Sequence, residues 1–221
     1  KDLLMKIFLS AIFCFVSSFL FSQNTYHFDY YLGYTSEIKR NKEISSNEFY
    51  SLINSKNQSY KAKIIKGEKT RSGVMIADYP NDILYYFDLK NENFPLKNED
   101  FIYVKSEKLK NVKKQFEDEF NNRVITAVPL YNDGIIFNYE IKESKKADSK
   151  KYSTKALVSF HKYKDDLAFV GLENLLDFYG VKKKISLPEN MILTSATSEF
   201  DGATKSLELK VIEPVEIIFT V

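Results

Sequence analysis

The sequence predicts a mainly β protein, a β-rich α+β fold built on one antiparallel, strongly curved sheet or half-barrel with one or two helices. Three observations indicate this. Apolar and polar residues alternate with a period of two through most of the chain, as in half-buried strands. Turn residues separate these stretches at hairpin spacing. Phe and Tyr supply all the aromatic residues, 15% of the chain, and such side chains favour strands. A β-sandwich is the alternative arrangement.

The first 22 residues are typical of an export signal rather than of the fold. Lys6 precedes an apolar run from Ile7 to Phe21 that is interrupted only by serines. This pattern predicts a secretory signal peptide cleaved after Ser22, with Gln23 as the new N-terminus. An uncleaved anchor is the alternative, although the run is short for a bilayer span of about 20 residues. Residues 1–4 precede the first Met and are interpreted as stray upstream sequence.

Residues 23–221 suit a single β-rich domain, because no repeat or long linker divides them. The only cysteine, Cys14, lies within the export signal, so the mature chain must be stabilised by its core and not by disulfides. The formal charge of +2 gives no electrostatic basis for nucleic-acid binding. After cleavage no transmembrane span is expected.

The first predicted strand runs from Asn24 to Ile38. One parity of this stretch is apolar and the other is mixed or polar, which indicates a half-buried strand that fixes the start of the mature chain in a sheet. The polar stretch Lys39–Asn47 predicts a loop. The apolar parity consists of Tyr26, Phe28, Tyr30, Leu32 and Tyr34.

Glu48–Asn54 and Ser59–Lys66 predict the next hairpin, since a short polar turn separates two strand-like runs. Ser46 could instead cap a short helix. A turn at Lys66–Lys69 follows.

Ser72–Asp78 predicts a strand that ends in the turn Tyr79-Pro80-Asn81-Asp82. Ile83–Lys90 is apolar on both parities, which predicts a strand covered on both faces. A polar loop over Asn91–Asp100 then leads to a strand at Phe101–Lys105.

Lys108–Asn122 leaves two interpretations open. Val112, Phe116 and Phe120 are spaced four apart, as on one face of a helix, but they also share strand parity. A helix or an irregular excursion is favoured over a strand.

Val124–Tyr131 and Ile135–Lys142 predict a hairpin, because Asp133-Gly134 between two apolar runs is a strong hairpin signal. The polar residues Glu143–Lys151 predict a solvated loop. Thr154–Tyr163 returns to strand alternation.

Asp165–Gly180 carries the clearest helical pattern. Asp165 or Asp166 can cap its start, and Gly180 fits its end. Because of Gly171, a hairpin that includes Leu167–Val170 is the alternative. The residues at helical spacing on one face are Ala168, Leu172, Leu175, Leu176 and Tyr179.

The residues after this helical pattern return to strands. Lys182–Leu187 predicts a short strand or connector, and Met191–Phe200 a strand that turns at Asp201-Gly202. One parity then stays apolar from Leu207 to Val221, interrupted only by Glu213. Pro214 cannot donate a ladder hydrogen bond and therefore marks an edge, a bend or a break.

No catalytic, cofactor-binding or metal-binding constellation is expected. The only histidines, His27 and His161, lie far apart on strands, whereas zinc sites combine several His or Cys ligands. The densest acidic groups are Glu117-Asp118-Glu119 and Asp165-Asp166. We interpret the first as solvated surface, because a catalytic pair requires a partly buried setting.

Several stretches resemble exported proteins of unknown function from Bacteroidota-type bacteria. They are the lead M-K-I-F…F-L-F-S-Q at residues 5–23, the Asn/Lys/Tyr/Phe-rich strands, and the segment Y-S-L-I-N-S-K-N-Q-S-Y at residues 50–60. The resemblance implies a bacterial envelope or secreted location and no activity. The expected half-barrel is also similar in shape to periplasmic lipoprotein carriers, but fold does not imply function.

We therefore predict an exported, non-catalytic cell-envelope protein, located in the periplasm, at the outer membrane or outside the cell. It would bind an apolar ligand such as a lipid or lipoprotein between the curved sheet and the helix. The lining residues would be Leu172, Leu175, Leu176 and Tyr179. The alternative is a structural or protein-interaction module that acts through exposed strand edges, and a third hypothesis is an acid-based hydrolase.

Overall fold

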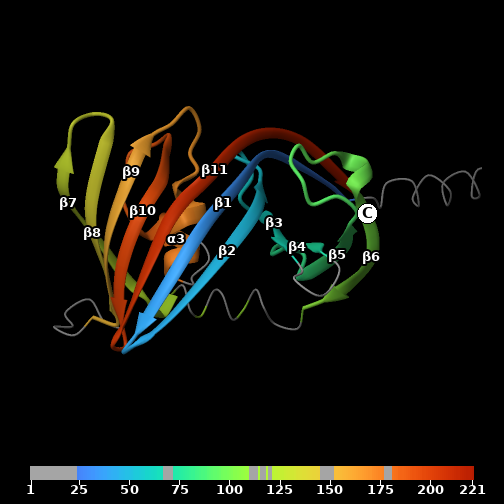
Figure 1. Ribbon diagram of the computed structural model, residues 1–221. Coiled ribbons are helices and arrows are strands. Elements are labelled where there is room, and N and C mark those ends of the chain that lie inside the picture. Colours follow the sequence, from blue (N-terminus) through green and yellow to red (C-terminus); the bar gives the residue numbers. More distant parts are fainter. Residues whose placement is uncertain are drawn as a thin grey trace, which may run out of the picture.

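The computed structural model describes residues 24–66, 72–109, 114, 118, 121–144, 152–176 and 181–221 (Figure 1). In these ranges eleven strands form one antiparallel sheet, and helix α3 (Ala168–Leu176) lies against it. The predicted fold class is confirmed, and the sheet is a single one, not the two sheets of a sandwich. The strands are β1 (Thr25–Arg40), β2 (Glu43–Ile53), β3 (Tyr60–Ile65), β4 (Gly73–Asp78), β5 (Ile83–Leu89), β6 (Phe101–Lys108), β7 (Val124–Asn132), β8 (Ile136–Ser144), β9 (Thr154–Lys162), β10 (Met191–Phe200) and β11 (Ala203–Thr220).

The strand order across the sheet is β6-β5-β4-β3-β2-β1-β11-β10-β9-β8-β7. Apart from β6 and β7, strands that follow one another in sequence are therefore neighbours, as short hairpin connections require. The first and last strands, β1 and β11, pair along nearly their whole length at the centre of the sheet. As a consequence β6 and β7, which are consecutive in sequence, form its two opposite edges.

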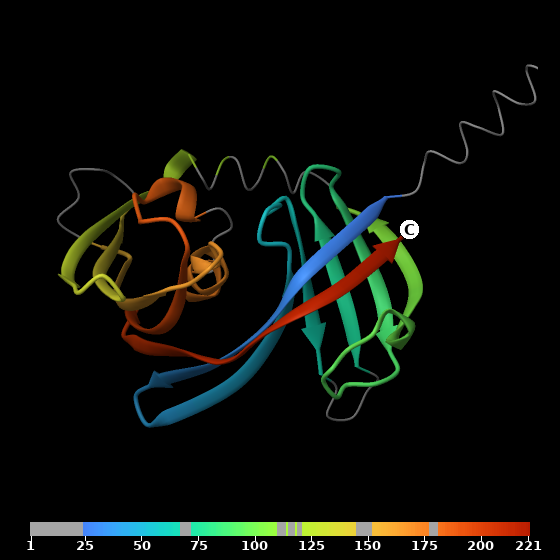
Figure 2. The same ribbon diagram turned by 90° about the horizontal axis from the view of Figure 1, so that it is seen from above.

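The long central strands divide the molecule into two lobes that curl around separate cores (Figure 2). The helix lobe contains α3, β7–β10 and the adjoining parts of β1, β2 and β11. The aromatic lobe contains β3–β6 and the opposite ends of β1 and β11. Because β2 and β3 pair only over Tyr50–Leu52 and Ala62–Ile64, the sheet can turn sharply between the lobes.

Both faces of β1 are covered where the lobes meet, which explains the unbroken buried run from Tyr30 to Tyr34. Tyr30, Leu32 and Tyr34 belong to the core of the helix lobe, whereas Tyr31 belongs to the core of the aromatic lobe. The tyrosine parity predicted as buried is thus confirmed. The burial of Tyr31 on the opposite parity was not predicted, because it depends on the fold of the second lobe.

Ring contacts form much of the core of the aromatic lobe. Phe219 near the end of β11 lies 4.6 Å from the ring of Phe87 and 4.8 Å from the ring of Phe101, measured between centroids. Phe28 on β1 contacts Phe219 and Tyr60 edge to face, with ring centroids 5.6 and 5.5 Å apart. Such arrangements are the favoured geometries of aromatic pairs. They fix the ends of β1 and β11 against β3–β6.

The prediction of a loop over Lys39–Asn47 is wrong. β1 continues to Arg40, the chain turns at Asn41 and Lys42, and β2 begins at Glu43. The first residues of β2 are exposed, so no core selects an apolar parity there. Asn41 has φ +57°, a conformation that Asn tolerates better than most residues. The same pairing excludes a helix capped by Ser46, because Ser46 belongs to β2 and lies opposite Glu37 of β1.

Pro214 lies inside β11, which is neither an edge strand nor broken there. Of the three predicted possibilities, the edge and the break are wrong and only the bend remains, at an irregularity in the pairing of β1 and β11. Pro214 pairs with Tyr30, and the register between β1 and β11 shifts between Phe28 and Tyr30. The extra residue on β11 allows a central strand to accept a proline without losing the pairing on both sides.

The segment Lys108–Asn122 connects the two edges of the sheet. Its described residues after Leu109 are helical: Lys114, Asp118, Asn121 and Asn122. They agree with the favoured helical interpretation. The predicted connector Lys182–Leu187 begins instead within a 3-10 helix, η2 (Val181–Lys184), and a second such helix, η1 (Asn98–Asp100), precedes β6.

Three further predictions fall wholly or largely on residues outside the described ranges. They are the signal peptide with its cleavage between Ser22 and Gln23, the turn at Lys66–Lys69, and most of the loop Glu143–Lys151. Glu143 and Ser144 themselves belong to β8 and are buried. Among the described residues, no helix has the length and hydropathy needed to cross a membrane.

Candidate functional site

Helix α3 lies on the concave side of the helix lobe, where the prediction placed an apolar ligand (Figure 2). It starts at Ala168, so Leu167–Val170 do not finish a hairpin. Leu172, Leu175 and Leu176 are buried in the core of this lobe together with the inward residues of β8–β11. Tyr179, the fourth predicted lining residue, lies outside the described residues.

Gly171 lets the helix approach the sheet closely. A Cβ atom at this position would lie 2.6 Å from Cβ of Leu193 on β10, closer than two carbon atoms can approach. The glycine that weakened the helix prediction is therefore required by the packing. With α3 seated in this way, its apolar side chains pack into the core on the concave side of the lobe.

Polar contacts surround this apolar contact area. The Tyr30 hydroxyl on β1 donates to the carboxylate of Asp165, just before α3. The Lys205 ammonium on β11 donates to the backbone carbonyl of Asn174, at 2.6 Å between Nζ and O. Burial is the larger cause and the hydrogen bond to Asp165 the second cause of a raised pKa of the Tyr30 hydroxyl. The hydroxyl is therefore protonated at neutral pH and can donate this hydrogen bond. The helix is thus held by its apolar face and by polar groups along its sides.

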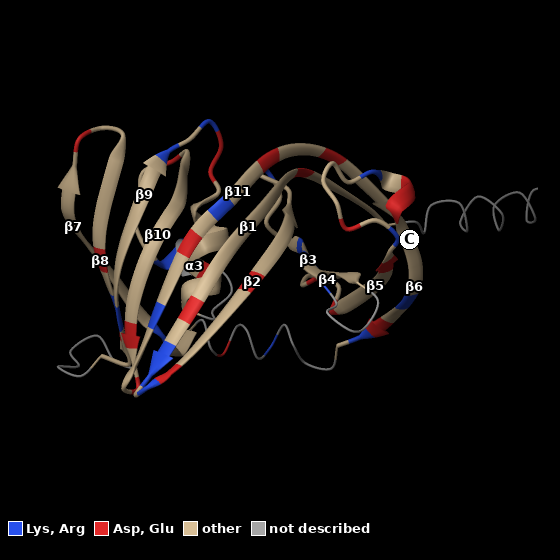
Figure 3. Cartoon of the chain, viewed as in Figure 1, with Lys and Arg blue, Asp and Glu red and all other residues tan. Residues whose placement is uncertain are grey.

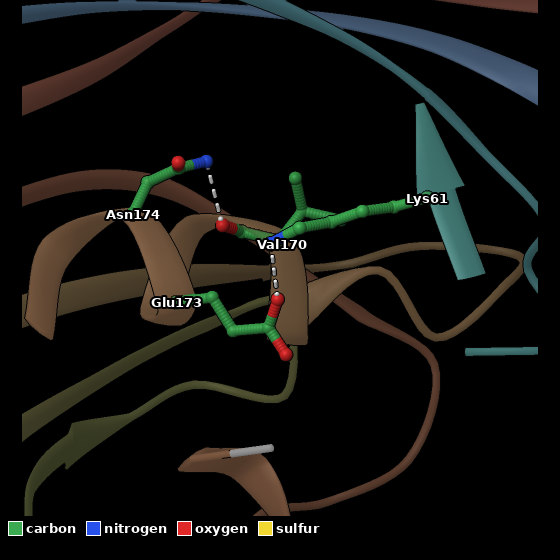
Figure 4. Close-up of polar contacts among 4 residues, drawn as sticks. All are labelled: Lys61, Val170, Glu173 and Asn174. Carbon is green, nitrogen blue, oxygen red and sulfur yellow. Dashed lines mark hydrogen bonds and ion pairs between the residues drawn. The ribbon is translucent and has the colours of Figure 1, made fainter. Parts of the chain in front are cut away.

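A further polar contact joins the two lobes. Lys61 on β3 reaches α3 beside Val170, and its Nζ atom lies 2.9 Å from Oε2 of Glu173 (Figure 4). The Glu173 side chain is 5% exposed and the Lys61 side chain 31% exposed. Burial alone would lower the pKa of Lys61, but Glu173 and Tyr79 raise it, and the balance lies above the ordinary lysine pKa. Lys61 is therefore charged at neutral pH.

The sequence did not indicate this pair. Glu173 lies off the apolar face that the helical spacing defines, and the sequence analysis assigns it no role. It is buried because the other lobe covers that side of α3, and Lys61 supplies the opposite charge that a buried carboxylate requires. No local pattern in the sequence relates residue 61 to residue 173.

Two hollows lined by described residues are open and lie away from the concave side. One, of about 330 Å³, lies over β7–β10 and is bordered by Leu130, Leu157 and the small polar residues Asn138, Ser159 and Ser195. It opens on the face opposite α3, because Leu157 is largely exposed while its neighbours in sequence point into the core. The other lies at the turn between β10 and β11.

The two histidines lie in different lobes, and the described residue of the acidic group at 117–119 is exposed. His27 is exposed on β1 in the aromatic lobe, whereas His161 lies on β9 in the helix lobe. Asp118 is exposed, and its neighbours Glu117 and Glu119 lie outside the described ranges. In the part of the chain that the structure describes, no group of three or more His, Cys, Asp or Glu residues could hold a metal ion.

Comparisons with known proteins give only distant similarities. No protein-family model matches the sequence, and no curated protein matches it significantly. Among solved structures the chain is similar to a LolA superfamily protein from Nitrosomonas europaea (7% identity, TM-score 0.31), a DUF1329 family protein from Desulfovibrio piger (11%, 0.27), and a domain named for outer membrane lipoprotein sorting from Vibrio parahaemolyticus (10%, 0.32). Each alignment covers 84% of this chain and 85% of the other. At these values no residue, ligand or activity is transferred to this chain.

Proposed function

We propose that this protein is a non-catalytic binding protein of the bacterial cell envelope that takes up an apolar chain, such as the acyl chain of a lipid or lipoprotein, beneath α3. One observation carries the proposal. Within the described residues, the short helix α3 lies with an apolar underside on the concave face of the helix lobe. The form described here is closed, with the side chains of α3 in the space that a ligand would occupy.

Binding then requires α3 to move away from β10, so that an acyl chain replaces its contacts with the sheet. Leu172, Leu175 and Leu176, and Tyr179 beyond them, would line the ligand. The polar contacts of Asp165, Glu173 and Asn174 would have to be broken in this movement and remade when the helix closes again. The buried apolar area of the helix would be covered by ligand instead of protein.

The first test is native mass spectrometry of residues 23–221, before and after denaturing extraction. A bound mass of lipid size that extraction removes is the expected result. Wild-type protein is then incubated with a diazirine-bearing palmitic acid and irradiated. Crosslinks are expected in Leu167–Leu176 and in β8–β10, and crosslinks confined to the outer hollow, or none, would contradict binding beneath the helix.

Matched substitutions separate the two apolar sites. Leu175→Gln places an amide under α3, and Leu157→Gln makes the same change in the outer hollow, where the side chain is exposed. We expect the first to reduce retention of the fatty acid and the second to leave it unchanged. Circular dichroism of both variants verifies folding, and the crosslinking of wild-type protein remains decisive if Leu175→Gln does not fold.

A second candidate function is a structural or protein-interaction module. The observation that favours it is exposure of large apolar side chains along both edge strands. On β6 these are Ile102, Tyr103 and Val104, and on β7 Val128, Leu130 and Tyr131. Such edges can pair with a strand of another chain. A lipid-free protein in the native mass spectra, together with envelope proteins recovered by crosslinking, would favour this function over the first.

A further inference from the structure

The two edges of the sheet differ in how open they are to pairing. On β7, Pro129 has no N–H group, and the register with β8 shifts between Pro129 and Tyr131. Both features hinder the addition of another strand. On β6 the residues after the bulge at Val104, Lys105–Lys108, pair regularly with β5 and include no proline. Among the described residues no strand pairs with the outer side of this segment.

The hydrogen bonds to β5 show which backbone groups of β6 point outward. The N–H of Leu109 donates to the carbonyl of Asp82, at 2.7 Å between N and O, so this pair belongs to the hydrogen-bonded set. In an antiparallel ladder hydrogen-bonded and non-hydrogen-bonded pairs alternate. The N–H and C=O groups of Lys105 and Glu107 therefore face β5, whereas those of Ser106 and Lys108 face the open side.

Two β6 strands can pair across a two-fold axis in a few registers that match this alternation, and one of these registers also places opposite charges together. In that register the axis passes beside Ser106, whose outward N–H and C=O exchange hydrogen bonds with the same groups of a second copy. Lys105 of each copy then lies opposite Glu107 of the other copy. Both are non-hydrogen-bonded pairs, in which the side chains are closely spaced. Basic and acidic residues alternate along this part of β6 (Figure 3).

We propose that this protein forms a two-fold symmetric dimer in which the β6 strands of two copies pair antiparallel about Ser106 and join the two sheets into one. The occupant of this edge is a second copy, because the charge pattern is complementary to itself. Lys105 and Glu107 already form an exposed ion pair within the strand, and two such pairs would form one cluster of alternating charge. Tyr103 and Val104, both about half exposed, adjoin the same edge.

Charge reversal tests the pairing directly. Lys105→Glu gives an acidic edge and Glu107→Lys a basic edge, so each variant alone should dimerise about tenfold more weakly than wild type. An equimolar mixture of the two should form a heterodimer, and the double variant K105E/E107K should dimerise like wild type. Sedimentation velocity over about 1–200 μM, a range in which weak dimers dissociate, measures all four.

Two further variants control for effects on folding and net charge. Lys210→Glu and Glu208→Lys make the same changes in a matching exposed pair on the central strand β11, and should not alter dimerisation. Ser106→Pro removes only an outward N–H and should abolish dimerisation while circular dichroism stays unchanged. A wild-type protein that is monomeric at every concentration, or a mixture of Lys105→Glu and Glu107→Lys that does not associate, would overturn the proposal.

Discussion

The ion pair between Lys61 and Glu173 gives the sharpest test of how the two lobes are held together. Coulomb's law at a separation of 2.9 Å gives about 1.4 kcal/mol in bulk water and about 6 kcal/mol at an effective dielectric constant of 20. The pair lies between these limits, because Glu173 is buried while Lys61 keeps 31% of its side-chain surface. We expect a coupling free energy of about 2–3 kcal/mol, more than the roughly 0.2–1 kcal/mol of exposed pairs.

The assay is a double-mutant cycle of Lys61→Met, Glu173→Gln and the double variant in urea denaturation. Lys61→Met should be the more destabilising single change, since it leaves a carboxylate 5% exposed without its cation. The effect should persist in high salt, because partly buried pairs are weakly screened. A coupling free energy below about 0.5 kcal/mol would refute the reasoning, as it is the value of a solvated surface pair.

The pH dependence of this contribution follows from the pKa of Lys61. That pKa is raised in the folded protein, so the stabilisation is fully present below the pKa of an unfolded lysine. It is lost only as the pH rises through the raised value. The cycle should therefore give the same coupling at pH 6 and pH 8, to within about 0.5 kcal/mol.

Two other predictions concern Gly171 and the tyrosines. Gly171→Ala should lower the free energy of unfolding by about 1 kcal/mol. The overlap of the new methyl group with Leu193 costs about 1–3 kcal/mol, and the gain in helix propensity returns about 1 kcal/mol. A variant that is more stable in urea would show that the helix is not seated on β10. Burial raises the pKa of Tyr31 to about 12, and the hydrogen bond to Glu48, with burial, raises that of Tyr50 to about 12. Both raised pKa values favour the protonated tyrosine in the folded state, so the free energy of unfolding should fall as the pH rises from about 10 towards 12. Absorbance at 295 nm follows tyrosine ionisation, and ionisation of all tyrosines near pH 10 would contradict this prediction.

The strands could be predicted from the sequence where one face of the sheet meets a core. The alternation through Tyr26–Tyr34 and the Asp133-Gly134 turn are local signals, because a strand with one buried face repeats every two residues. The same argument failed at Lys39–Asn47, where the β1–β2 hairpin extends into solvent. Without a buried face, a strand has no reason to alternate and resembles a loop in its composition.

The candidate site was predictable only in its apolar part. The spacing of Leu172, Leu175 and Leu176 follows from the helical period, and these residues are buried as expected. The pair of Lys61 and Glu173 was not predictable, because it forms between residues 112 apart when the second lobe covers α3. Gly171 was interpreted as a weakness of the helix, although its role is to admit the side chain of Leu193.

The sequence by itself determined the mainly β class, the turns and the helix. The regular backbone of a half-buried strand or helix makes apolar residues recur at a short, fixed spacing along the sequence. Tertiary structure decided what lies on either side of each strand. The pairing of β1 with β11, the division into two lobes and the separation of β6 and β7 to opposite edges depend on contacts between distant segments. Such contacts are selected by packing and by paired charges, which leave no period in the sequence.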